Sequence, residues 1–256
     1  MTVKVLVCIK SIPAVAGRIT LTGDARAIDT RHLGFAVGPH EECAVEQAVR
    51  LVEEHGGESV VLTLGPAEAV EQLRDAMAIG VSRAIHLVTG GEEWDPESTA
   101  SAIVDAIRED EAGSGPFDVL LLGNEAGDTG GYQVAVRVGR ALGRPVVTGV
   151  KGMAVADGVV RSEQEAEGGR DVYEIPLPAV VGVLEGINLP RYPSVPGRIR
   201  ARSKPVAASS PARPDQRLEM VRLVVPEGAV KQATILGTGA SAAAAVVDMF
   251  DSIGVL

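Results

Sequence analysis

The sequence predicts an α/β protein built on a parallel, twisted sheet with helices on both faces. Short runs rich in valine, leucine and isoleucine alternate with runs of helix length along the first 150 residues. The first of these runs, VKVLVCI at 3–9, is largely apolar, which is typical of strands that are covered on both faces. Strands separated by helices in this rhythm indicate right-handed crossovers and a parallel sheet.

The first helix is predicted over 42–54, because Val45, Val49 and Val52 recur at helical spacing. It ends at the glycine pair 56–57, since glycine accepts the backbone conformation that follows a helix. A polar stretch separates this helix from the first strand. The same reasoning predicts strands over 59–64, 84–88 and 118–122, helices over 67–79, 97–108 and 132–142, and a further strand that begins at 146–147.

The rhythm changes after residue 150. Runs 153–160 and 171–175 are predicted as antiparallel strands, with Asp157-Gly158 and Gly168-Gly169 as turns, and 179–184 as a further apolar strand. Residues 188–205 have no periodicity, 206–216 reads as a linker, 218–225 as a possible strand, and 240–253 as a last helix. We therefore expect an α/β nucleotide-binding domain over 1–187, a basic partner-recognition segment over 188–205 and a C-terminal arm with its helix over 206–256. An isolated helix must bury its apolar side, and a partner subunit is one candidate.

Composition restricts the function. The formal net charge is −10, which argues against a general nucleic-acid binder with a broad basic face. No stretch is long and apolar enough to span a bilayer, and residues 1–10 lack the features of a signal peptide. The two cysteines, Cys8 and Cys43, fall in a predicted strand and helix, so we expect buried thiols and a cytoplasmic protein.

The most informative loop is GNEAGDTGG at 123–131, between a buried strand and a helix. Ligands of parallel sheets bind beyond the carboxyl ends of the strands, and glycines let backbone N–H groups approach a phosphate. Thr129 offers a hydroxyl, whereas Asp128 is better suited to capping the helix. A capped turn with flexible glycines explains the loop about equally well. The loop is neither a Walker loop nor a GxGxxG fingerprint.

A second group, Gly38-Pro39-His40-Glu41-Glu42, precedes the first helix. Proline and carboxylates are ordinary at a helix start, so we interpret His40 as a rim residue. The other histidines show no paired spacing, and we expect no metal site. The sequence contains no nucleophile elbow, no readable Cys/His pair and no motif of paired acids. It therefore predicts a protein that is not an enzyme acting through its own side chains.

A third feature is the basic segment 188–204, NLPRYPSVPGRIRARSK. A docking surface explains it, because proline restricts the backbone, Tyr192 and Val195 offer apolar anchors, and the arginines attract acidic surfaces. A solvated basic loop explains it about equally well, since charge runs are usually solvated.

Taken together, these features resemble the electron-transfer flavoprotein beta subunit family. The motifs that carry the resemblance are VKVLVCIK, GPHEECAVEQAVRL, LGPAEAVEQLRDAMAIGVSRAIHL, LLGNEAGDTGG and, most specifically, LPAVVGVLEGINLPRYPSVPGRIRARSKP. The resemblance covers about the first four-fifths of the chain. It differs from the usual pattern at Ile12 to Val15, where many relatives have an aromatic residue, and at Gly38, His40 and Gln164.

The resemblance implies a fold like that of the adenine-nucleotide alpha hydrolases and a heterodimer with an alpha subunit that holds most of a redox-active FAD. It implies that this chain binds AMP, or a second FAD in its place. It also implies electron transfer from dehydrogenases, such as those acting on acyl-CoA in fatty acid oxidation, to a quinone-linked acceptor. The implied nucleotide-binding residues are Cys8, Gly38, Pro39, His40, Glu41, Leu64, Gly123, Asn124, Glu125, Ala126, Gly127, Asp128, Thr129, Gly130, Gly131, Tyr132, Gln133 and Val134. The implied partner-binding residues are Arg191, Tyr192, Pro193, Val195, Pro196, Arg198 and Arg200.

Two other classes fit less well. A stand-alone nucleotide-binding protein of the universal-stress type needs a Gly-x-x-Gly loop followed after about nine residues by Gly-Ser/Thr. Gly127 and Gly130 supply the first half, and the second half is missing. An adenylating enzyme of the pyrophosphatase type needs an SGGxDS-like loop after the first strand, where this chain has Lys10-Ser11-Ile12-Pro13.

Overall fold

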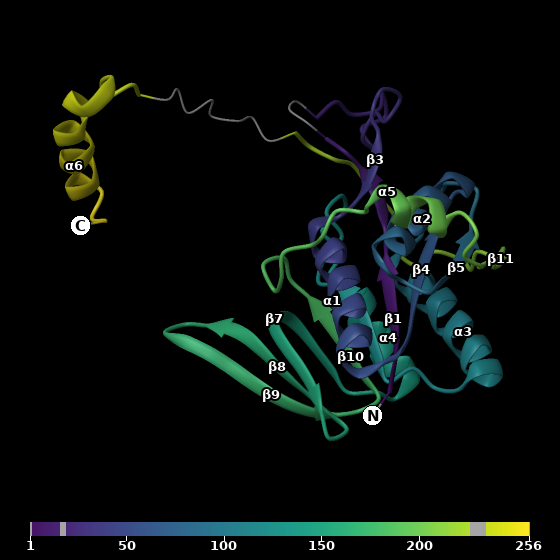
Figure 1. The fold of residues 1–256 in the computed structure, drawn as a ribbon. Coiled ribbons are helices and arrows are strands. Elements are labelled where there is room, and N and C mark those ends of the chain that lie inside the picture. Colours follow the sequence, from purple (N-terminus) through teal and green to yellow (C-terminus); the bar gives the residue numbers. More distant parts are fainter. Residues whose placement is uncertain (1, 16–18, 226–233, 256) are drawn as a thin grey trace. The chain divides into compact units, whose positions relative to one another are not determined.

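A computed structural model describes residues 2–15, 19–225 and 234–255 (Figure 1). The chain forms two compact units. The larger comprises Met1–Arg18 and Asp29–Met220, and the smaller comprises Ile19–Ile28 and Val221–Leu256. The candidate site lies within the larger unit.

The larger unit is built on a nine-stranded sheet with the order β11-β5-β4-β1-β6-β10-β7-β8-β9. The strands from β11 to β7 in this order run parallel, while β8 and β9 are antiparallel. Their bounds are β1 Val3–Ile9, β4 Gly57–Gly65, β5 Arg83–Val88, β6 Val119–Gly123, β7 Val146–Ala156, β8 Val159–Ala166, β9 Gly169–Pro176, β10 Ala179–Val183 and β11 Val206–Ser209. The predicted α/β class, with a mostly parallel sheet and added antiparallel strands, is confirmed.

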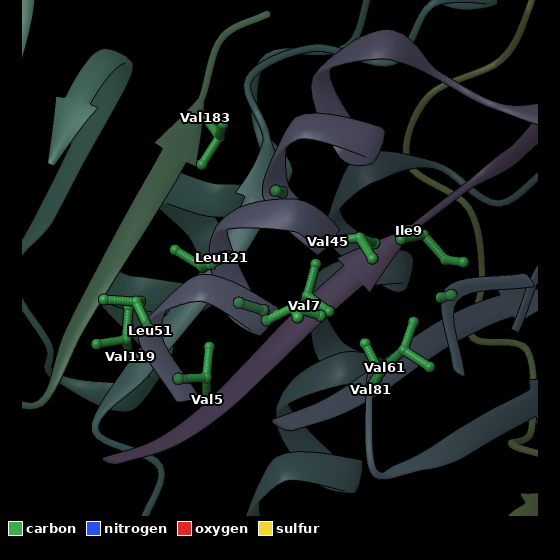
Figure 2. Packing of buried hydrophobic residues seen from close by; sticks show 14 of the residues in the cluster. Val5, Val7, Ile9, Val45, Leu51, Val61, Val81, Val119, Leu121 and Val183 are labelled. Atoms are coloured by element: carbon green, nitrogen blue, oxygen red, sulfur yellow. The ribbon is translucent and has the colours of Figure 1, made fainter. Parts of the chain in front are cut away.

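Helices cover both faces of the sheet. On one face, α1 (Pro39–His55), α2 (Val70–Ile79) and α5 (Val195–Ala201) contribute to a core with every second residue of β1: Val5, Val7 and Ile9 (Figure 2). On the other face, α3 (Pro96–Ser114) and α4 (Val134–Leu142) pack with Leu6 and Cys8. Since successive strand residues point to opposite faces, one apolar strand serves both cores.

Most predicted elements are confirmed, with shifted ends. Helix α1 begins at Pro39 rather than 42, α3 extends to Ser114, and α4 begins at Val134 rather than 132. A 3₁₀ turn, η1 (Ala67–Ala69), precedes α2. The polar stretch after β1 contains an unpredicted antiparallel pair, β2 (Ser11–Pro13) and β3 (Phe35–Val37).

The prediction of one strand over 153–160 is wrong, because the turn falls inside it. Strand β7 continues to Ala156, and Asp157 and Gly158 turn the chain with φ angles of 51° and 77° before β8 begins. Aspartate and glycine tolerate this left-handed conformation, so the predicted turn residues are right even though the strand is not.

The interpretation of 188–205 and 206–216 as irregular chain is also wrong in part. Ser194 caps α5 by accepting a hydrogen bond from the Gly197 N–H at 3.1 Å, and β11 pairs in parallel with β5. Arg74 of α2 donates hydrogen bonds to the carbonyls of Ala201, at the end of α5, and Lys204, shortly before β11, at 2.6 and 2.7 Å. These long-range contacts order a segment that has no periodicity of its own.

The smaller unit contains most of the predicted C-terminal arm. Residues 218–225, predicted as a possible strand, form no strand. The predicted last helix is confirmed as η2 (Gly239–Ala242) followed by α6 (Ala243–Ser252), and α6 has no buried residue.

Candidate functional site

The order of the strands reverses between β1 and β6. The chain passes from β1 outward to β4 and β5 and later returns to β6 on the other side of β1. In such sheets the crossover helices leave in opposite directions at the reversal, which opens a crevice at the carboxyl ends of the two strands. Here Ile9 ends β1 and Gly123 ends β6.

Two helices that begin near this crevice have no side-chain cap. The N-cap residue of α1 is Gly38 and that of α4 is Gln133, and neither side chain accepts a bond from its helix. By contrast, Asp95 caps α3 and Ser194 caps α5. Uncapped helix N-termini present unpaired N–H groups and partial positive charge, which favours an anion.

The prediction that Asp128 caps α4 is therefore wrong. Its carboxylate instead forms an ion pair with Lys10, the residue after β1, at 2.9 Å. Lys10 also pairs with Glu93 at 3.1 Å. Sequence reasoning missed Lys10, although a lysine directly after a buried strand is a recognisable signal.

The loop 124–133 presents free backbone amides. It is folded by two of its own bonds, from Gly130 N–H to the Ala126 carbonyl at 2.7 Å and from Ala126 N–H to the Gly131 carbonyl at 3.2 Å. Within the described parts of the chain, no acceptor contacts the backbone N–H groups of Gly127, Asp128, Thr129 and Gly131. A side chain added at Gly130 would meet nothing within 4 Å. Free amides beside open space are suited to binding a phosphate.

His40 is buried, so its interpretation as a rim residue is wrong. Its Nδ1 accepts a hydrogen bond from the Glu185 N–H at 2.9 Å. In the neutral ring the proton therefore lies on Nε2, which is 3.5 Å from Glu125 Oε1. This contact joins the start of α1 to the loop 124–133. The Lys10–Asp128 pair joins the end of β1 to the same loop.

Glu41 lies between the glycines that begin α1 and end β6. Only 5% of the residue is exposed, and its Oε2 has no hydrogen-bond partner in the described structure. A side chain at Gly38 would overlap Oε2, and one at Gly123 would lie 2.7 Å from Cδ. Burial raises the pKa of Glu41 to about 7; the nearby Asp128 carboxylate adds to this effect and Lys10 opposes it.

The other predicted nucleotide-binding residues lie at the same edge of the sheet. Cys8 is opposite Leu62 of β4 and Leu122 of β6. Burial raises the pKa of the Cys8 thiol to about 12, so the thiol stays neutral. Leu64 lies one strand away, near the end of β4, and is only partly buried. The structure thus brings the start of α1, the end of β1 and the loop after β6 together.

The residues predicted to bind a partner divide into two groups. Arg191 pairs with Glu46 at 2.9 Å and Glu53 at 2.6 Å, both on α1, and Arg198 pairs with Asp75 at 2.6 Å. These guanidinium groups bind carboxylates of the chain itself. Tyr192 and Val195 are 96% and 73% exposed. Pro193, Pro196 and Arg200 complete the predicted set; Pro193 is half-buried, and Pro196 and Arg200 are exposed.

Comparison with known proteins identifies the family. Residues 27–214 match the family described as "Electron transfer flavoprotein domain". A protein named electron transfer flavoprotein subunit beta from Syntrophomonas wolfei is 35% identical over 227 residues, which cover 88% of this chain and 87% of the relative. The chain belongs to the electron-transfer flavoprotein beta subunit family.

Other beta subunits agree with this assignment. The one from Bradyrhizobium diazoefficiens is 29% identical over 88% of this chain and 90% of its own length. The one from Mycobacterium tuberculosis is 30% identical over 79% and 77%. Membership in an electron-transfer flavoprotein family means an electron-transfer role, and the designation as a beta subunit implies an alpha-subunit partner.

Two negative findings apply to the described residues of this beta subunit. None of their helices combines the length and hydropathy that crossing a bilayer requires. They also contain no group of three or more histidine, cysteine or acidic side chains placed to hold a metal ion.

Proposed function

We propose that this chain binds AMP in the crevice between β1 and β6 and helps to hold the FAD of an alpha subunit. The heterodimer takes electrons from cytoplasmic dehydrogenases, such as those acting on acyl-CoA, and passes them to a quinone-linked acceptor. In this proposal the FAD supplies the redox chemistry. The chain binds AMP and helps to bind and orient the FAD, and none of its side chains acts as a catalyst in this proposal.

The observation that carries the proposal is the set of free amides in the loop 124–133. Four backbone N–H groups without an acceptor face an edge where Gly127, Thr129 and Gly130 are exposed. A phosphate bound there would also lie near the uncapped start of α4. Amides and helix N-termini are the usual phosphate ligands of such sheets, so the residues present fit an adenylate.

A polar atom in the crevice is suited to contact the remainder of a nucleotide. Glu41 Oε2 is a buried polar atom that lacks a partner in the described structure, and a ligand could supply one. We assign the base and ribose to the side of the crevice lined by residues 38–41 and Cys8, and the phosphate to the loop 124–133.

The exposed segment around α5 is proposed to meet dehydrogenases. Tyr192 and Val195 are large apolar side chains that water surrounds almost fully. Aromatic anchors of this kind are enriched in interfaces. Arg200 and Arg202 are exposed and make no ion pair with another described residue, so their charge is available to attract an acidic partner.

The decisive experiment is to co-express the chain with an alpha subunit and identify the nucleotides released from the purified complex by mass spectrometry. We expect a yellow heterodimer that contains one FAD and one AMP. A colourless complex, or one that contains a single FAD and no second nucleotide, would contradict the proposal. Two FAD molecules per heterodimer would show that a second flavin occupies the crevice in place of AMP.

A further inference from the structure

The crevice carries more negative than positive charge. Lys10 is a cation there, and it is already bound by Asp128 and Glu93. Glu41 lies beside this group, and Glu125 approaches the neutral His40 ring. An AMP phosphate would add further negative charge to the same place. A site that accepts this anion must therefore reduce its own charge, and one of its carboxylates is suited to do so.

Among the carboxyl groups at the crevice, Glu41 is the one best suited to be protonated and neutral. Its side chain is enclosed between Gly38 and Gly123, and within the described residues it makes no ion pair. A buried carboxylate oxygen without a hydrogen bond is unfavourable as an anion, because water no longer solvates it. A proton on Oε2 removes the charge and creates a donor that needs an acceptor. The ligand is the natural source of that acceptor.

We propose that Glu41 contacts bound adenylate as a neutral carboxylic acid and donates a hydrogen bond to one of the acceptor atoms of the ligand. This inference rests on the proposed AMP binding. It adds that AMP binding above neutral pH takes one proton from solvent onto Glu41. The affinity for AMP is then strongest at or below neutral pH and weakens as the pH rises.

Burial of the Glu41 side chain sets the direction of this effect, and the groups that face it modify its size. The backbone N–H of Glu41 and the Lys10 ammonium at the end of β1 favour the carboxylate, whereas Asp128 of the β6–α4 loop and Glu42 of α1 oppose it. A phosphate bound at the loop 124–133, which contains Asp128, acts on Glu41 as Asp128 does and raises the pKa of Glu41 further above its free value of about 7. Below that value the free protein already carries the proton. Above it, binding must take the proton up, and the affinity falls by up to about tenfold per pH unit.

The experiment is a calorimetric titration of the nucleotide-free heterodimer with AMP, at pH 8 in two buffers of different ionisation enthalpy. The wild-type protein is expected to take up most of one proton. Its affinity should fall as the pH rises from 7 to 9, by up to about tenfold per pH unit. Glu41→Gln keeps a neutral donor, so it should bind AMP as tightly as wild type at pH 7, without proton uptake or pH dependence over this range. Glu54→Gln makes the same change at the far end of α1, where the side chain is 72% exposed. This variant should keep both the proton uptake and the pH dependence of wild type.

The outcomes separate this inference from the proposed function. A wild-type heterodimer that does not bind AMP refutes the proposed function and the inference with it. AMP binding without proton uptake at pH 8 refutes only the inference. An at least tenfold loss of affinity in Glu41→Gln, with proton uptake retained, also refutes it. If Glu41→Gln does not fold, the comparison of the two buffers on the wild-type protein still decides the question.

Discussion

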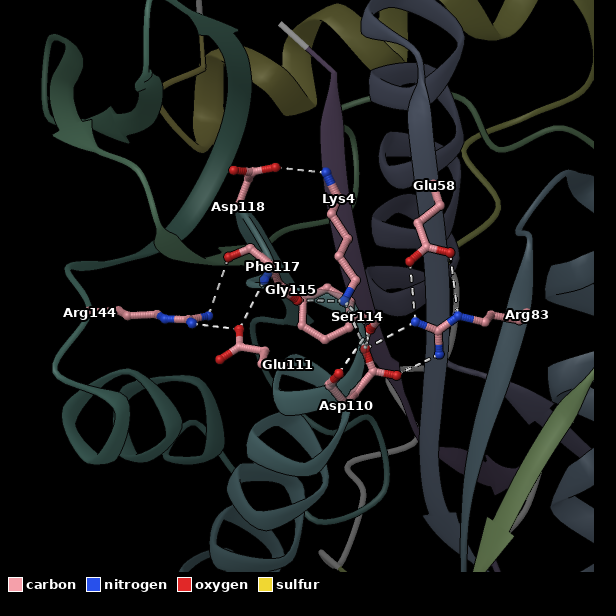
Figure 3. A network of polar contacts seen from close by, with 10 residues as sticks. All are labelled: Lys4, Glu58, Arg83, Asp110, Glu111, Ser114, Gly115, Phe117, Asp118 and Arg144. Atoms are coloured by element: carbon pink, nitrogen blue, oxygen red, sulfur yellow. Dashed lines mark hydrogen bonds and ion pairs between the residues drawn. The ribbon is translucent and has the colours of Figure 1, made fainter.

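A partly buried ion-pair network at the amino end of β1 gives the sharpest stability prediction for this chain (Figure 3). Asp110 of α3 accepts from Lys4 at 2.8 Å, from Arg83 at 2.6 and 3.0 Å, and from Ser114 at 2.7 Å. The Asp110 side chain is 12% exposed and that of Lys4 is 11% exposed. This one carboxylate therefore connects β1, β5 and α3.

We expect Asp110→Asn to destabilise the protein by about 2–4 kcal/mol. Removing one partner of a buried pair usually costs about 3–5 kcal/mol, because the other charge is left without compensation. The loss of stability should be smaller here, since Lys4 keeps its hydrogen bond to the Gly115 carbonyl at 2.7 Å and Arg83 keeps its hydrogen bond to Glu58 at 3.2 Å. For a chain of this length, such a change lowers the melting temperature by roughly 5–15 °C.

Differential scanning calorimetry of the heterodimer measures this effect. Asp105→Asn is the matched control, because Asp105 lies on the same helix with its side chain 74% exposed and only a 4.0 Å contact to Arg108. That variant should change stability by less than about 0.5 kcal/mol. Nucleotide content should be unchanged in both, since Asp110 lies at the opposite end of the sheet from the crevice. A loss below 1 kcal/mol in Asp110→Asn, or equal losses in the two variants, would refute the reasoning.

The same network predicts part of the acid sensitivity. Burial alone would raise the pKa of Asp110, but hydrogen bonds from Arg83, Lys4 and Ser114 hold that pKa well below its usual range. A group whose pKa is lower in the folded state stabilises the protein above its unfolded pKa of about 4 and loses this contribution as the pH falls towards the folded value. Acid unfolding of Asp110→Asn should therefore depend less steeply on pH below about 4 than that of wild type. Equal slopes would exclude this role.

Three further predictions concern binding. Gly130→Val should lower AMP content and heterodimer yield together. Gly168→Val is the control, because it also replaces a positive-φ glycine beside open space, and it should lower neither quantity. Full AMP occupancy in Gly130→Val would show that the loop is misassigned. Reversing the charges of Arg200 and Arg202 should slow reduction of the heterodimer by an acidic dehydrogenase, mainly at low salt. Near physiological ionic strength the Debye length is only about 8–10 Å, so salt screens these exposed charges. Unchanged rates at low salt would show that the two residues have no part in docking. Tyr192→Ala should weaken the same reduction without changing the melting temperature, since the side chain contacts little of its own chain; normal reduction kinetics would exclude the anchor role.

The elements that the sequence predicts well are those whose signal is local. Strands β1, β4 and β6 are largely apolar because both faces are covered, and α1 carries an apolar stripe that matches the core. Gly56 ends α1 as predicted, and Gly80 and Gly143 follow α2 and α4 in the same way. Each of these signals depends on residues that are neighbours in the sequence.

The elements that the sequence does not predict depend on distant contacts. Helix α5 has only seven residues, too few for a period to be visible, although Ser194 with Pro196 two residues later is a recognisable helix start. Strand β11 exists because β5 offers it an unpaired edge. In the site, the enclosure of Glu41 joins residues about 80 positions apart, from Gly38 to Gly123. No local pattern encodes such contacts.

The two proposed binding surfaces use opposite electrostatics, and this difference follows from the structure. The charged side chains at the crevice are mainly carboxylates, so an adenylate there depends on backbone amides and on the neutral state of Glu41 rather than on cations. The segment around α5 keeps free charge on Arg200 and Arg202, because Arg191 and Arg198 are neutralised within the chain. Salt screens exposed charges much more than buried hydrogen bonds. Raising the ionic strength should therefore weaken contact with dehydrogenases while it leaves AMP bound, and a parallel loss of both would contradict this division of roles.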